Sequence, residues 1–495
     1  MRNNRYAKET VTAKYVGQQA LLEKAQSYMT PDEVSLINHA YVFAQQAHGG
    51  KKRESGEPYF NHVVIVANTL LKMHQDVYTV CAGLLHDVIE DTPTSKEELA
   101  RLFGPEVANL VEGVSKQGKD QFTNLLDYRN AYASKIVTGV VTDIRIIIIK
   151  LADRLHNMNT LQYKKKKQRI AEISLETLQV YGYIAKIIGA YRIKYELEDL
   201  CLEHLLPEVY RIINGERYIE KQALVEVKEE FVKAFQLVRD PFVKHITIRP
   251  KIKNSYGIYK EGFETDGMPT LKRIYDPLNL ERIKLEEIDD LRQLKIVVDT
   301  VAECYKTYDI LCHLKEISKS WNRTLAVYPE IFEYEVLPET VTDYIQNEKK
   351  NRYQSLDFNM KDPKGRLYQV QIRTRQMQTK NSYGYMYDTK KEMIMGNQFI
   401  KRMEQMIEQS ENNQQIIDQF LRMASNRVRV QIDGSSVEVE PESTVGDLKV
   451  LYHIDEIHVN GELVPDEYQF LENDIVELAP ISRPTFAYRK KMGLR

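Results

Sequence analysis

The stretch LLHDVIEDTP (residues 84–93) places one histidine and three carboxylates within six residues, directly after an apolar run. From the end of a helix, the adjacent side chains of His86 and Asp87 can reach a common point. A His-Asp pair by itself is most often a surface or capping feature. Whether this pair forms a functional site therefore depends on the polar groups that other segments bring to it.

Two further segments carry polar groups of the kind that bind metal ions. In LADRLHNM (151–158), Asp153 and Asn157 stand four residues apart and therefore on one face of a helix. KKRESGEPYFNH (51–62) ends on a histidine. The resulting set of two imidazoles and two carboxylates is His62, His86, Asp87 and Asp153. Without thiolates, such a set suits Mn²⁺, iron or Zn²⁺ better than a soft metal ion.

Buried, hydrogen-bonded core residues are the alternative interpretation of these four polar groups. Because buried charges without partners are costly, four such groups in otherwise apolar helices favour a metal site. Glu90 lies one helical turn after His86, and Asp91 follows it. Either carboxylate could orient a metal-bound water without being a ligand. The metal ion would lower the pKa of that water and supply a nucleophile near neutral pH.

The length of 495 residues is enough for about two to four domains. Residues 1–205 carry apolar residues at helical spacing, so we expect an all-α domain there. This includes IRIIIIKLADRLHNM (144–158), whose β-branched start favours a strand but whose continuation predicts one helix. Residues 206–398 mix short β-like runs with helical segments, which is typical of an α+β domain.

The C-terminal part of the chain is predicted to be smaller and mainly β. Residues 399–424 predict a polar connecting helix, and residues 425–482 predict short strands with a hairpin turn at the Asn-Gly pair 460–461. Residues 483–495 form a basic tail. This tail and the run KKKKQR (164–169) are local exceptions in a chain of net charge −2. Such runs are usually solvated surface.

The composition indicates the compartment in which the chain acts. The four cysteines show no CxxC spacing, so neither a disulfide framework nor a zinc knuckle is indicated. The opening MRNNRYAKET has no apolar core, and no window approaches about 18 uninterrupted apolar residues, so we expect neither secretion nor a membrane span. With 43% hydrophobic and 28% charged residues, the chain is typical of a globular protein, and we expect it to be cytoplasmic.

Three segments resemble the successive motifs of one enzyme family. HGGKKRESGEPYFNH (48–62), GLLHDVIEDTP (83–93) and KLADRLHNMNTL (150–161) are similar to those of the HD-domain hydrolase in long RelA/SpoT-homologue alarmone enzymes. The likeness continues through residues 181–210, which resemble the family's helical link to a second domain. It implies hydrolysis of the 3′-pyrophosphate of (p)ppGpp to GDP or GTP and pyrophosphate, with Mn²⁺ or another divalent metal ion as cofactor.

The resemblance also implies a role for each residue of the predicted site. The family's metal ligands match His62, His86, Asp87 and Asp153. Its acidic pair, which handles the catalytic water, matches Glu90 and Asp91. The implied substrate-binding residues are Arg53 and Asn157, and the neighbouring Lys52, together with Lys51, is predicted to add positive charge for the anionic substrate. One departure is Glu54, where the family usually carries a lysine after the arginine.

A second resemblance covers residues 240–390, which are similar to the synthetase domain of the same enzymes. That domain transfers pyrophosphate from ATP to the 3′-hydroxyl of GDP or GTP. Its metal ligands match Asp290 and Gln369, but the family carries a glutamate at the second position, and a neutral amide is a poor Mg²⁺ ligand. Arg352 and Asp357 stand where the family has glycine and histidine. We therefore expect a pseudo-synthetase that no longer makes the alarmone.

Several residues of this second domain nevertheless match the family's binding groups. Tyr353 matches the tyrosine that stacks on guanine, and three cations, Arg249, Lys251 and Arg373, keep a basic lining. Two interpretations stay open. These residues either hold the fold as remnants, or they still bind a regulatory nucleotide.

Residues 425–482 resemble a TGS domain, a small β-grasp module that contacts uncharged tRNA in ribosome-associated relatives. The domain is acidic, which argues against RNA affinity driven by phosphate contacts, so we do not expect ribosome or tRNA contact. The predicted architecture is an all-α HD-domain hydrolase, an α+β nucleotidyltransferase-like pseudo-synthetase and a β-grasp TGS domain. The alternatives to a monofunctional hydrolase are a bifunctional (p)ppGpp synthetase/hydrolase and a nucleotide-binding stringent-response regulator.

Overall fold

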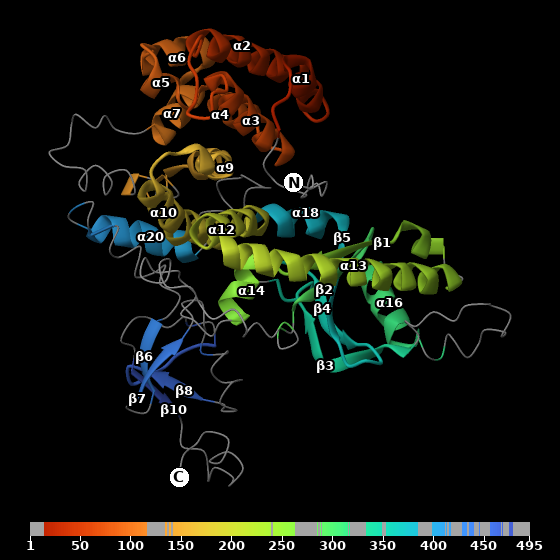
Figure 1. The fold of residues 1–495 in the computed structure, drawn as a ribbon. Coiled ribbons are helices and arrows are strands. Elements are labelled where there is room, and N and C mark those ends of the chain that lie inside the picture. Colours follow the sequence, from red (N-terminus) through yellow and green to blue (C-terminus); the bar gives the residue numbers. More distant parts are fainter. Residues whose placement is uncertain are drawn as a thin grey trace. The chain divides into compact units, whose positions relative to one another are not determined.

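A computed structural model describes most of the chain, in two compact units that lie within residues 1–407 and 408–495 (Figure 1). The described residues are 14–115, 134–135, 138–139, 142–238, 241–262, 285, 288, 290–314, 316, 333–348, 353–384, 398–410, 412, 415–416, 428–432, 435–439, 445, 456–466, 468 and 475–478. The domain boundaries predicted inside these units remain predictions.

The N-terminal part of the first unit is helical, with one isolated bridge between Lys52 and Pro58 among its described residues. Its helices are α1 (Gln18–Gln26), α2 (Pro31–Ala47), α3 (Tyr59–Lys72), α4 (Val77–Leu85), α5 (Val88–Asp91), α6 (Lys96–Phe103), α7 (Pro105–Val114), α9 (Ile144–Asn159), α10 (Lys167–Glu176), α11 (Tyr183–Ile187), α12 (Tyr191–Leu205) and α13 (Pro207–Leu237). A π-helical turn, Thr177–Gly182, joins α10 to α11.

Helix α9 confirms the prediction that the β-branched run continues as one helix. The four isoleucines at 146–149 are all buried, so the helix is covered on every side at this point, as expected for a fully apolar segment. Its first turn is capped by Asp143, whose carboxylate accepts a hydrogen bond from the backbone N–H of Arg145 at 2.9 Å. Burial therefore overrides the strand preference of isoleucine here.

Helices α3 and α4 pack closely because a glycine lies between them. A Cβ atom at Gly83 would collide with Cδ1 of Leu70 on α3, so only glycine permits this approach without displacing the leucine. Helix α4 begins at the cap Asp76, which accepts from the N–H of Thr79 at 2.9 Å, and ends at His86. The close packing brings the end of α4 towards the first turn of α3.

Two long helices, α12 and α13, connect the helical part to a mixed sheet in the same unit. On α12, the carboxylate of Asp199 accepts from the backbone N–H of Tyr256 at 3.0 Å. On α13, Glu220 accepts two hydrogen bonds from the largely buried guanidinium of Arg292, at 2.7 and 2.8 Å. Such two-pronged ion pairs fix geometry as well as adding energy.

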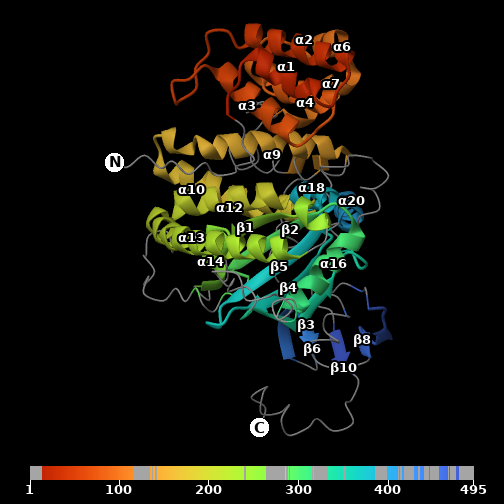
Figure 2. The same ribbon diagram turned by 90° about the vertical axis from the view of Figure 1, so that its right-hand side faces the viewer.

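The sheet of the first unit has five strands in the order β1-β2-β5-β4-β3. These are β1 (Thr247–Ile252), β2 (Arg292–Val298), β3 (Glu335–Asp343), β4 (Leu356–Lys361) and β5 (Leu367–Thr374). Strands β2 and β5 are parallel, and the other neighbours are antiparallel. With helices α14 (Ser255–Gly262), α16 (Val301–Cys312) and α18 (Arg375–Tyr383), this is the predicted α+β arrangement (Figure 2).

The register separates an apolar face of the sheet from a polar face. The apolar face includes Leu294, Ile296, Val370 and Phe358, and Tyr308 of α16 packs edge-on against Phe358. The polar face carries the alternate residues of the central strands: Arg249, Lys251, Gln293, Lys295, Asp357, Asn359, Gln369, Gln371 and Arg373. Helix α12 contributes Tyr195 to the polar face, because the Nζ of Lys251 lies 4.3 Å above its ring.

The second unit contains a small mixed sheet with the order β7-β6-β10-β8-β9. Its strands are β6 (Val428–Ile432), β7 (Ser435–Val439), β8 (Ile457–Val459), β9 (Glu462–Leu463) and β10 (Ile475–Leu478). The predicted hairpin turn is confirmed, since Asn460 and Gly461 join β8 to β9 with φ angles of 54° and 83°. Positive φ at both positions is the reason for the Asn-Gly preference.

The described part of the predicted connecting helix is α20 (Gln398–Gln409). Residues 417–424 of that prediction and the basic tail 483–495 lie outside the described residues. Among the helices that the structure describes, none combines the length and the apolar character that crossing a membrane requires.

Candidate metal centre

The four predicted ligands converge from three helices. His62 is in the first turn of α3, His86 caps the C-terminus of α4, Asp87 follows it directly, and Asp153 lies in the middle of α9. Helix α9 runs alongside α3 and α4 in both views (Figures 1 and 2). All four side chains are nearly enclosed, with exposed fractions between 1% and 8%.

The two imidazoles face the same pair of carboxylate oxygens. The Nε2 atom of His62 lies 3.2 Å from Oδ1 of Asp153 and 3.6 Å from Oδ2 of Asp87. The Nε2 atom of His86 lies 3.1 Å from Oδ2 of Asp87 and 3.7 Å from Oδ1 of Asp153. Ligands that each sit about 2.1 Å from one metal ion are roughly 3–4 Å apart, so these spacings fit a shared ion.

Both carboxylates of the cluster are held in their ionised form in spite of burial. Burial raises the pKa of Asp87, but the imidazoles of His86 and His62 outweigh this effect and hold the pKa well below its ordinary value. Burial likewise raises the pKa of Asp153, and Lys150 together with the two imidazoles lowers it further than burial raises it. The same carboxylates raise the pKa of His86 to about 10, although burial lowers it. Two ionised carboxylates therefore face the two Nε2 atoms.

The hydrogen bonds of His86 leave one of its nitrogen atoms available to a metal ion. Its Nδ1 donates to the backbone carbonyl of Gly83 at 2.9 Å, so the neutral ring carries its lone pair on Nε2. That Nε2 is buried and, among the described residues, makes no hydrogen bond. A second-shell carbonyl of this kind is the usual way to orient a ligand histidine. The donor set thus fits a divalent metal ion.

Tyr59 and His48 support Asp87 from one side. The hydroxyl of Tyr59 donates to Oδ2 of Asp87 at 2.6 Å, and burial together with that carboxylate raises the pKa of Tyr59. The ring of His48 stacks on Tyr59 with centroids 5.0 Å apart. Burial lowers the pKa of His48. The sequence analysis singled out neither residue, although both lie within the quoted segment 48–62.

Arg53 and Asn157, predicted to bind substrate, lie together at the edge of the cluster. The guanidinium of Arg53 donates from Nη2 to Oδ1 of Asn157 at 2.5 Å. The amide of Asn157 in turn donates to Oδ1 of Asp153 at 2.6 Å. Lys52 is exposed and takes part in the backbone bridge to Pro58, away from these contacts.

A further histidine, His156, links Arg53 to His62, one of the predicted ligands. Its Nδ1 lies 3.0 Å from Nη1 of Arg53 and 2.8 Å from Nδ1 of His62. Burial, followed by the charges of His62 and Arg53, lowers the pKa of His156 to about 3. The sequence analysis did not identify this residue, although its spacing of three from Asp153 places it near the same helix face.

The acidic pair Glu90 and Asp91 occupies the short helix α5, which begins immediately after Asp87. Both side chains are half-buried. The Nζ of Lys51, rather than Lys52, donates to the backbone carbonyl of Asp91. The carboxylate of Glu54 accepts from the Nζ of Lys164 at 2.7 Å, which brings the first lysine of the basic run 164–169 beside Glu54.

The two predicted metal ligands of the second domain, Asp290 and Gln369, have different surroundings. On the polar face of the sheet, Gln369 stands between Gln293 of β2 and Asn359 of β4, so its neighbours in register are amides. Asp290 accepts a hydrogen bond from the Nζ of Lys253. Within the described residues, the histidines and acids whose ligand atoms all lie close enough together to hold an ion are His62, His86 and Asp87. Asp153 adjoins this group through its contacts with both imidazoles, and no described residue of the sheet belongs to it.

The binding groups predicted for the second domain bond mainly to one another. The hydroxyl of Tyr353 donates to Oδ2 of Asp357 at 2.9 Å and accepts from Nη2 of Arg373 at 3.0 Å. The guanidinium of Arg373 also lies over the ring of Tyr353, 5.2 Å from its centroid. Lys251 contacts Tyr195, and Arg249 is exposed. Arg352 lies outside the described residues.

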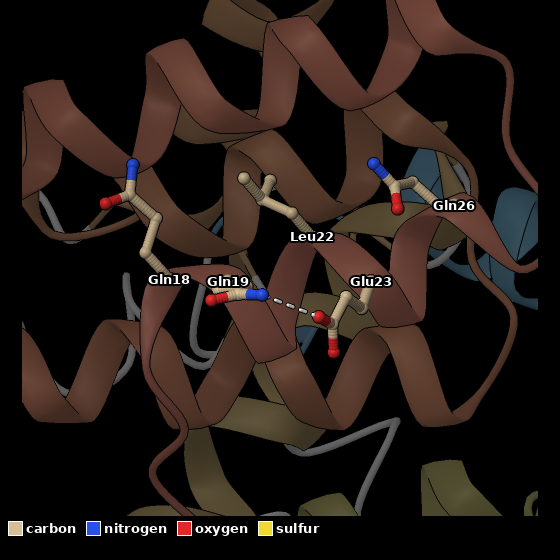
Figure 3. A pocket seen from close by; sticks show the side chains of 5 residues that line it. All are labelled: Gln18, Gln19, Leu22, Glu23 and Gln26. Atoms are coloured by element: carbon tan, nitrogen blue, oxygen red, sulfur yellow. Dashed lines mark hydrogen bonds between the residues drawn. The ribbon is translucent and has the colours of Figure 1, made fainter.

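A surface hollow on α1 is separate from both sites (Figure 3). It is lined by Gln18, Gln19, Leu22, Glu23 and Gln26. The side-chain amide of Gln19 donates to the carboxylate of Glu23 at 3.0 Å. One helix supplies all five residues, and they include none of the predicted catalytic or binding groups.

Two family models match the chain. A model described as "HD domain" matches residues 40–190, and one described as "Region found in RelA / SpoT proteins" matches residues 268–390. The first range contains all four converging ligands, and the second contains Asp290, Gln369 and Tyr353.

Three curated relatives are similar to this chain over most of its length. A probable guanosine-3′,5′-bis(diphosphate) 3′-pyrophosphohydrolase of Synechocystis is 36% identical over 70% of this chain and 41% of its own length. A GTP pyrophosphokinase rsh of Brucella ovis is 30% identical over 74% of this chain and 44% of its own length. The bifunctional (p)ppGpp synthase/hydrolase SpoT of Escherichia coli is 35% identical over 72% and 46%, respectively. The matched part of the chain thus spans less than half the length of these relatives.

Removing one carboxylate should abolish tight metal binding. We expect Asp153→Ala to weaken the affinity for Mn²⁺ by roughly 100-fold or more, since loss of second-shell partners alone typically costs 10–100-fold. Titration of the apoprotein, followed by the electron paramagnetic resonance signal of free Mn²⁺, measures this. Asp32→Ala, at an exposed position in α2, is the control and should bind as the unmodified chain does. Unchanged Mn²⁺ affinity in Asp153→Ala would exclude Asp153 as a ligand.

Proposed function

Since this chain is a member of the RelA/SpoT family, we propose that its helical part hydrolyses the 3′-pyrophosphate of (p)ppGpp, releasing GDP or GTP and pyrophosphate. The observation that carries this proposal is the enclosed pair of imidazoles facing two ionised carboxylates within 3.1–3.7 Å. Buried carboxylates need a positively charged partner, and a divalent metal ion at the centre of the cluster would be one.

Mn²⁺ is the proposed cofactor, held by His62, His86, Asp87 and Asp153. A divalent ion bound there would lower the pKa of a coordinated water and supply hydroxide near neutral pH. The protein's part is to keep each ligand oriented before substrate arrives. The carbonyl of Gly83 fixes His86, the hydroxyl of Tyr59 fixes Asp87, and Asn157 fixes Asp153.

Glu90 and Asp91 are the proposed proton-handling residues. Helix α5 starts directly after Asp87, so both carboxylates stand beside the ligands without belonging to the converging set. One carboxylate would accept the proton of the attacking water. That proton would then be available to the ribose 3′-oxygen when its bond to phosphorus breaks.

Arg53 is the proposed phosphate-binding cation. Its guanidinium is half-buried at the edge of the cluster, and such planar cations recognise phosphate groups well. Although residue 54 is a glutamate and not the lysine expected from the family, a cation still lies beside it, because the Nζ of Lys164 is 2.7 Å from the Glu54 carboxylate. A lysine from the run 164–169 would thereby stand in for the lysine that the family usually carries after the arginine.

Changing the proton acceptor should slow the reaction but leave the metal bound. We expect Glu90→Gln to reduce turnover of ppGpp roughly 10²–10⁴-fold, the range of general acid–base groups, with Mn²⁺ affinity within about threefold of the unmodified chain. Release of pyrophosphate and a parallel Mn²⁺ titration measure the two quantities. Glu112→Gln, at a partly exposed glutamate of α7, is the matched control. Turnover of Glu90→Gln at the unmodified rate would remove Glu90 from the mechanism.

Loss of synthetase activity is the second part of the proposal. Pyrophosphoryl transfer needs metal ions that neutralise the charge developing on the phosphates. Position 369 offers an amide between two further amides, and Asp290 is paired with Lys253. The relatives named pyrophosphokinase or bifunctional keep the alternative of an active synthetase open.

No alarmone should form when the full chain is incubated with ATP, GDP and Mg²⁺. Nucleotide chromatography checks this in Asp153→Ala, whose hydrolase is disabled, so that no product is lost. Gln369→Glu in the same background should also make no ppGpp, because the hydroxyl of Tyr353 remains hydrogen-bonded to both Asp357 and Arg373. Synthesis of ppGpp by the chain that retains Gln369 would restore the bifunctional alternative.

A nucleotide-binding regulatory role of the second domain is favoured by one observation. Lys251, Lys295 and Arg373 crowd the polar face of the sheet. Burial, followed by the other two cations of this group, lowers the pKa of Lys295 well below its ordinary value. Burial and the charge of Arg373 lower that of Lys251 to about 8. A bound polyphosphate would relieve this repulsion.

Binding at this face could reach the metal centre through α12. That helix packs against α9, which carries Asp153, and places Tyr195 against Lys251. A nucleotide shifts activity only if it favours one arrangement of the two parts over another. A coupling of about 1–3 kcal/mol would change affinity or activity roughly 5–150-fold.

GDP should bind the full chain in the absence of any divalent metal ion if this second role holds. Calorimetric titration would then show binding that Lys251→Ala removes and Lys364→Ala, at an exposed turn, retains. No heat of binding with the unmodified chain would leave the domain as a structural remnant.

The small sheet of the second unit supports the proposed TGS assignment only in its general form. It is a mixed five-stranded sheet with the predicted Asn-Gly hairpin. Its partner is not indicated by any described residue. The acidic composition continues to argue against RNA.

A further inference from the structure

His156 stands between two hydrogen-bond donors and offers one lone pair to both. Its Nδ1 lies 3.0 Å from Nη1 of Arg53 and 2.8 Å from Nδ1 of His62. The three rings of His62, His86 and His156 lie close together, with centroids 4.8 Å apart for His62 and His156 and 5.1 Å for His62 and His86. These contacts determine where the proton of His62 must be.

Arg53 determines the protonation state of the His156 nitrogen that it contacts. A guanidinium has only donors, so the Nδ1 of His156 that faces it must be unprotonated and accept. The Nδ1 of His62 faces the same lone pair, and two bare nitrogens at 2.8 Å would repel each other. His62 therefore donates from Nδ1. In its neutral form, the lone pair of His62 is then on Nε2, the atom that faces Asp87 and Asp153.

We propose that His156 is a positioning residue of the metal centre: its Nδ1 lone pair keeps the proton of His62 on Nδ1 and thereby presents Nε2 to the metal ion. Second-shell acceptors of this kind fix the tautomer and increase the basicity of ligand histidines. His86 receives the same support from the backbone carbonyl of Gly83. The two ligand histidines are thus oriented differently, and only His62 depends on a side chain that substitution can remove.

The shared lone pair also connects substrate binding to the metal ligand. While Arg53 donates to His156, the lone pair is divided between Arg53 and His62. When a phosphate group draws Arg53 away, His156 accepts from His62 alone, and His62 becomes a better ligand. Loss of Arg53 should therefore not weaken metal binding, whereas loss of the His156 acceptor should.

This role of His156 rests on the proposed metal-dependent function, but its test uses Mn²⁺ alone. The full chain and four variants are titrated with Mn²⁺ and followed by electron paramagnetic resonance. We expect His156→Leu to bind Mn²⁺ roughly 10–100-fold more weakly, the usual effect of losing a second-shell partner. His156→Asn, whose amide oxygen can replace Nδ1 as acceptor, should recover most of that loss. Arg53→Ala should bind as tightly as the unmodified chain or more tightly.

His204→Leu is the matched control for damage to α9. The Nε2 of His204 lies 2.9 Å from the backbone carbonyl of Met158 on that helix, away from the ligands. We expect its Mn²⁺ affinity to stay within about threefold of the unmodified chain, whereas loss of a second-shell partner typically costs 10–100-fold. Nitrogen-15 spectra of metal-free protein give a second readout that a merely structural role would not move. The Nδ1 of His62 should carry a proton in the unmodified chain and in His156→Asn. In His156→Leu it should lose that proton in part, because only the Nε2 of His62 then still faces acceptors, the carboxylates of Asp87 and Asp153.

Equal Mn²⁺ affinity in His156→Leu and the unmodified chain would overturn the proposal, as would equal losses in the Leu and Asn variants. A parallel loss in Arg53→Ala would do the same, because it would indicate a general disturbance of the network. If His156→Leu does not fold, two measurements still test the proposal. These are the nitrogen-15 spectrum of the unmodified chain and the Mn²⁺ affinities of His156→Asn and Arg53→Ala. An unmodified chain that binds Mn²⁺ as expected but hydrolyses no ppGpp would contradict the proposed function and leave the role of His156 intact. An unmodified chain without Mn²⁺ affinity would contradict both.

Discussion

Two ionised carboxylates held out of water are the constraint on which the helical part of this protein depends. Asp87 and Asp153 are 6% and 8% exposed, and a buried charge without a partner is strongly destabilising. The imidazoles of His62 and His86 contact these carboxylates, and the Nζ of Lys150 lies 3.6 Å from Oδ2 of Asp153. The position between the four side chains suits a divalent ion. Gly83 serves this arrangement twice. Its lack of a side chain lets α4 approach α3, and its carbonyl orients His86.

The sheet of the first unit separates the residues that hold its fold from the polar residues to which the proposal assigns a lost synthetase site. The apolar face, with Leu294, Ile296 and Phe358, packs independently of what the other face carries. On the polar face, Gln369 lies in register with the amides Gln293 and Asn359, and the hydroxyl of Tyr353 donates to Asp357 and accepts from Arg373. These contacts are the physical basis of the proposed loss of synthetase activity. Lys251 and Lys295, which lie close to each other and to Arg373, are the groups of this face that a polyphosphate ligand would contact in the proposed regulatory role.

Much of the fold could be predicted from the sequence, and so could the side chains that converge between α3, α4 and α9, because the deciding signals are local. Helical spacing identified α9 in spite of its isoleucines, and the Asn-Gly pair identified the β8–β9 turn. Tyr59 and His156 were not predicted, since their roles arise only when α3, α4 and α9 pack together. The Glu54–Lys164 pair joins residues 110 positions apart, and the sequence contains no signal for such a contact. The Tyr353–Asp357–Arg373 contacts likewise depend on the register of β4 and β5.

Hydrolysis of ppGpp in water labelled with oxygen-18 tests the central claim most directly. If a metal-activated water attacks the 3′-pyrophosphate, the full chain with Mn²⁺ should release pyrophosphate that carries one labelled oxygen, together with unlabelled GDP, and excess chelator should stop the release. Turnover that continues in excess chelator, release of inorganic phosphate in place of pyrophosphate, or no turnover at all with Mn²⁺ present would contradict the claim.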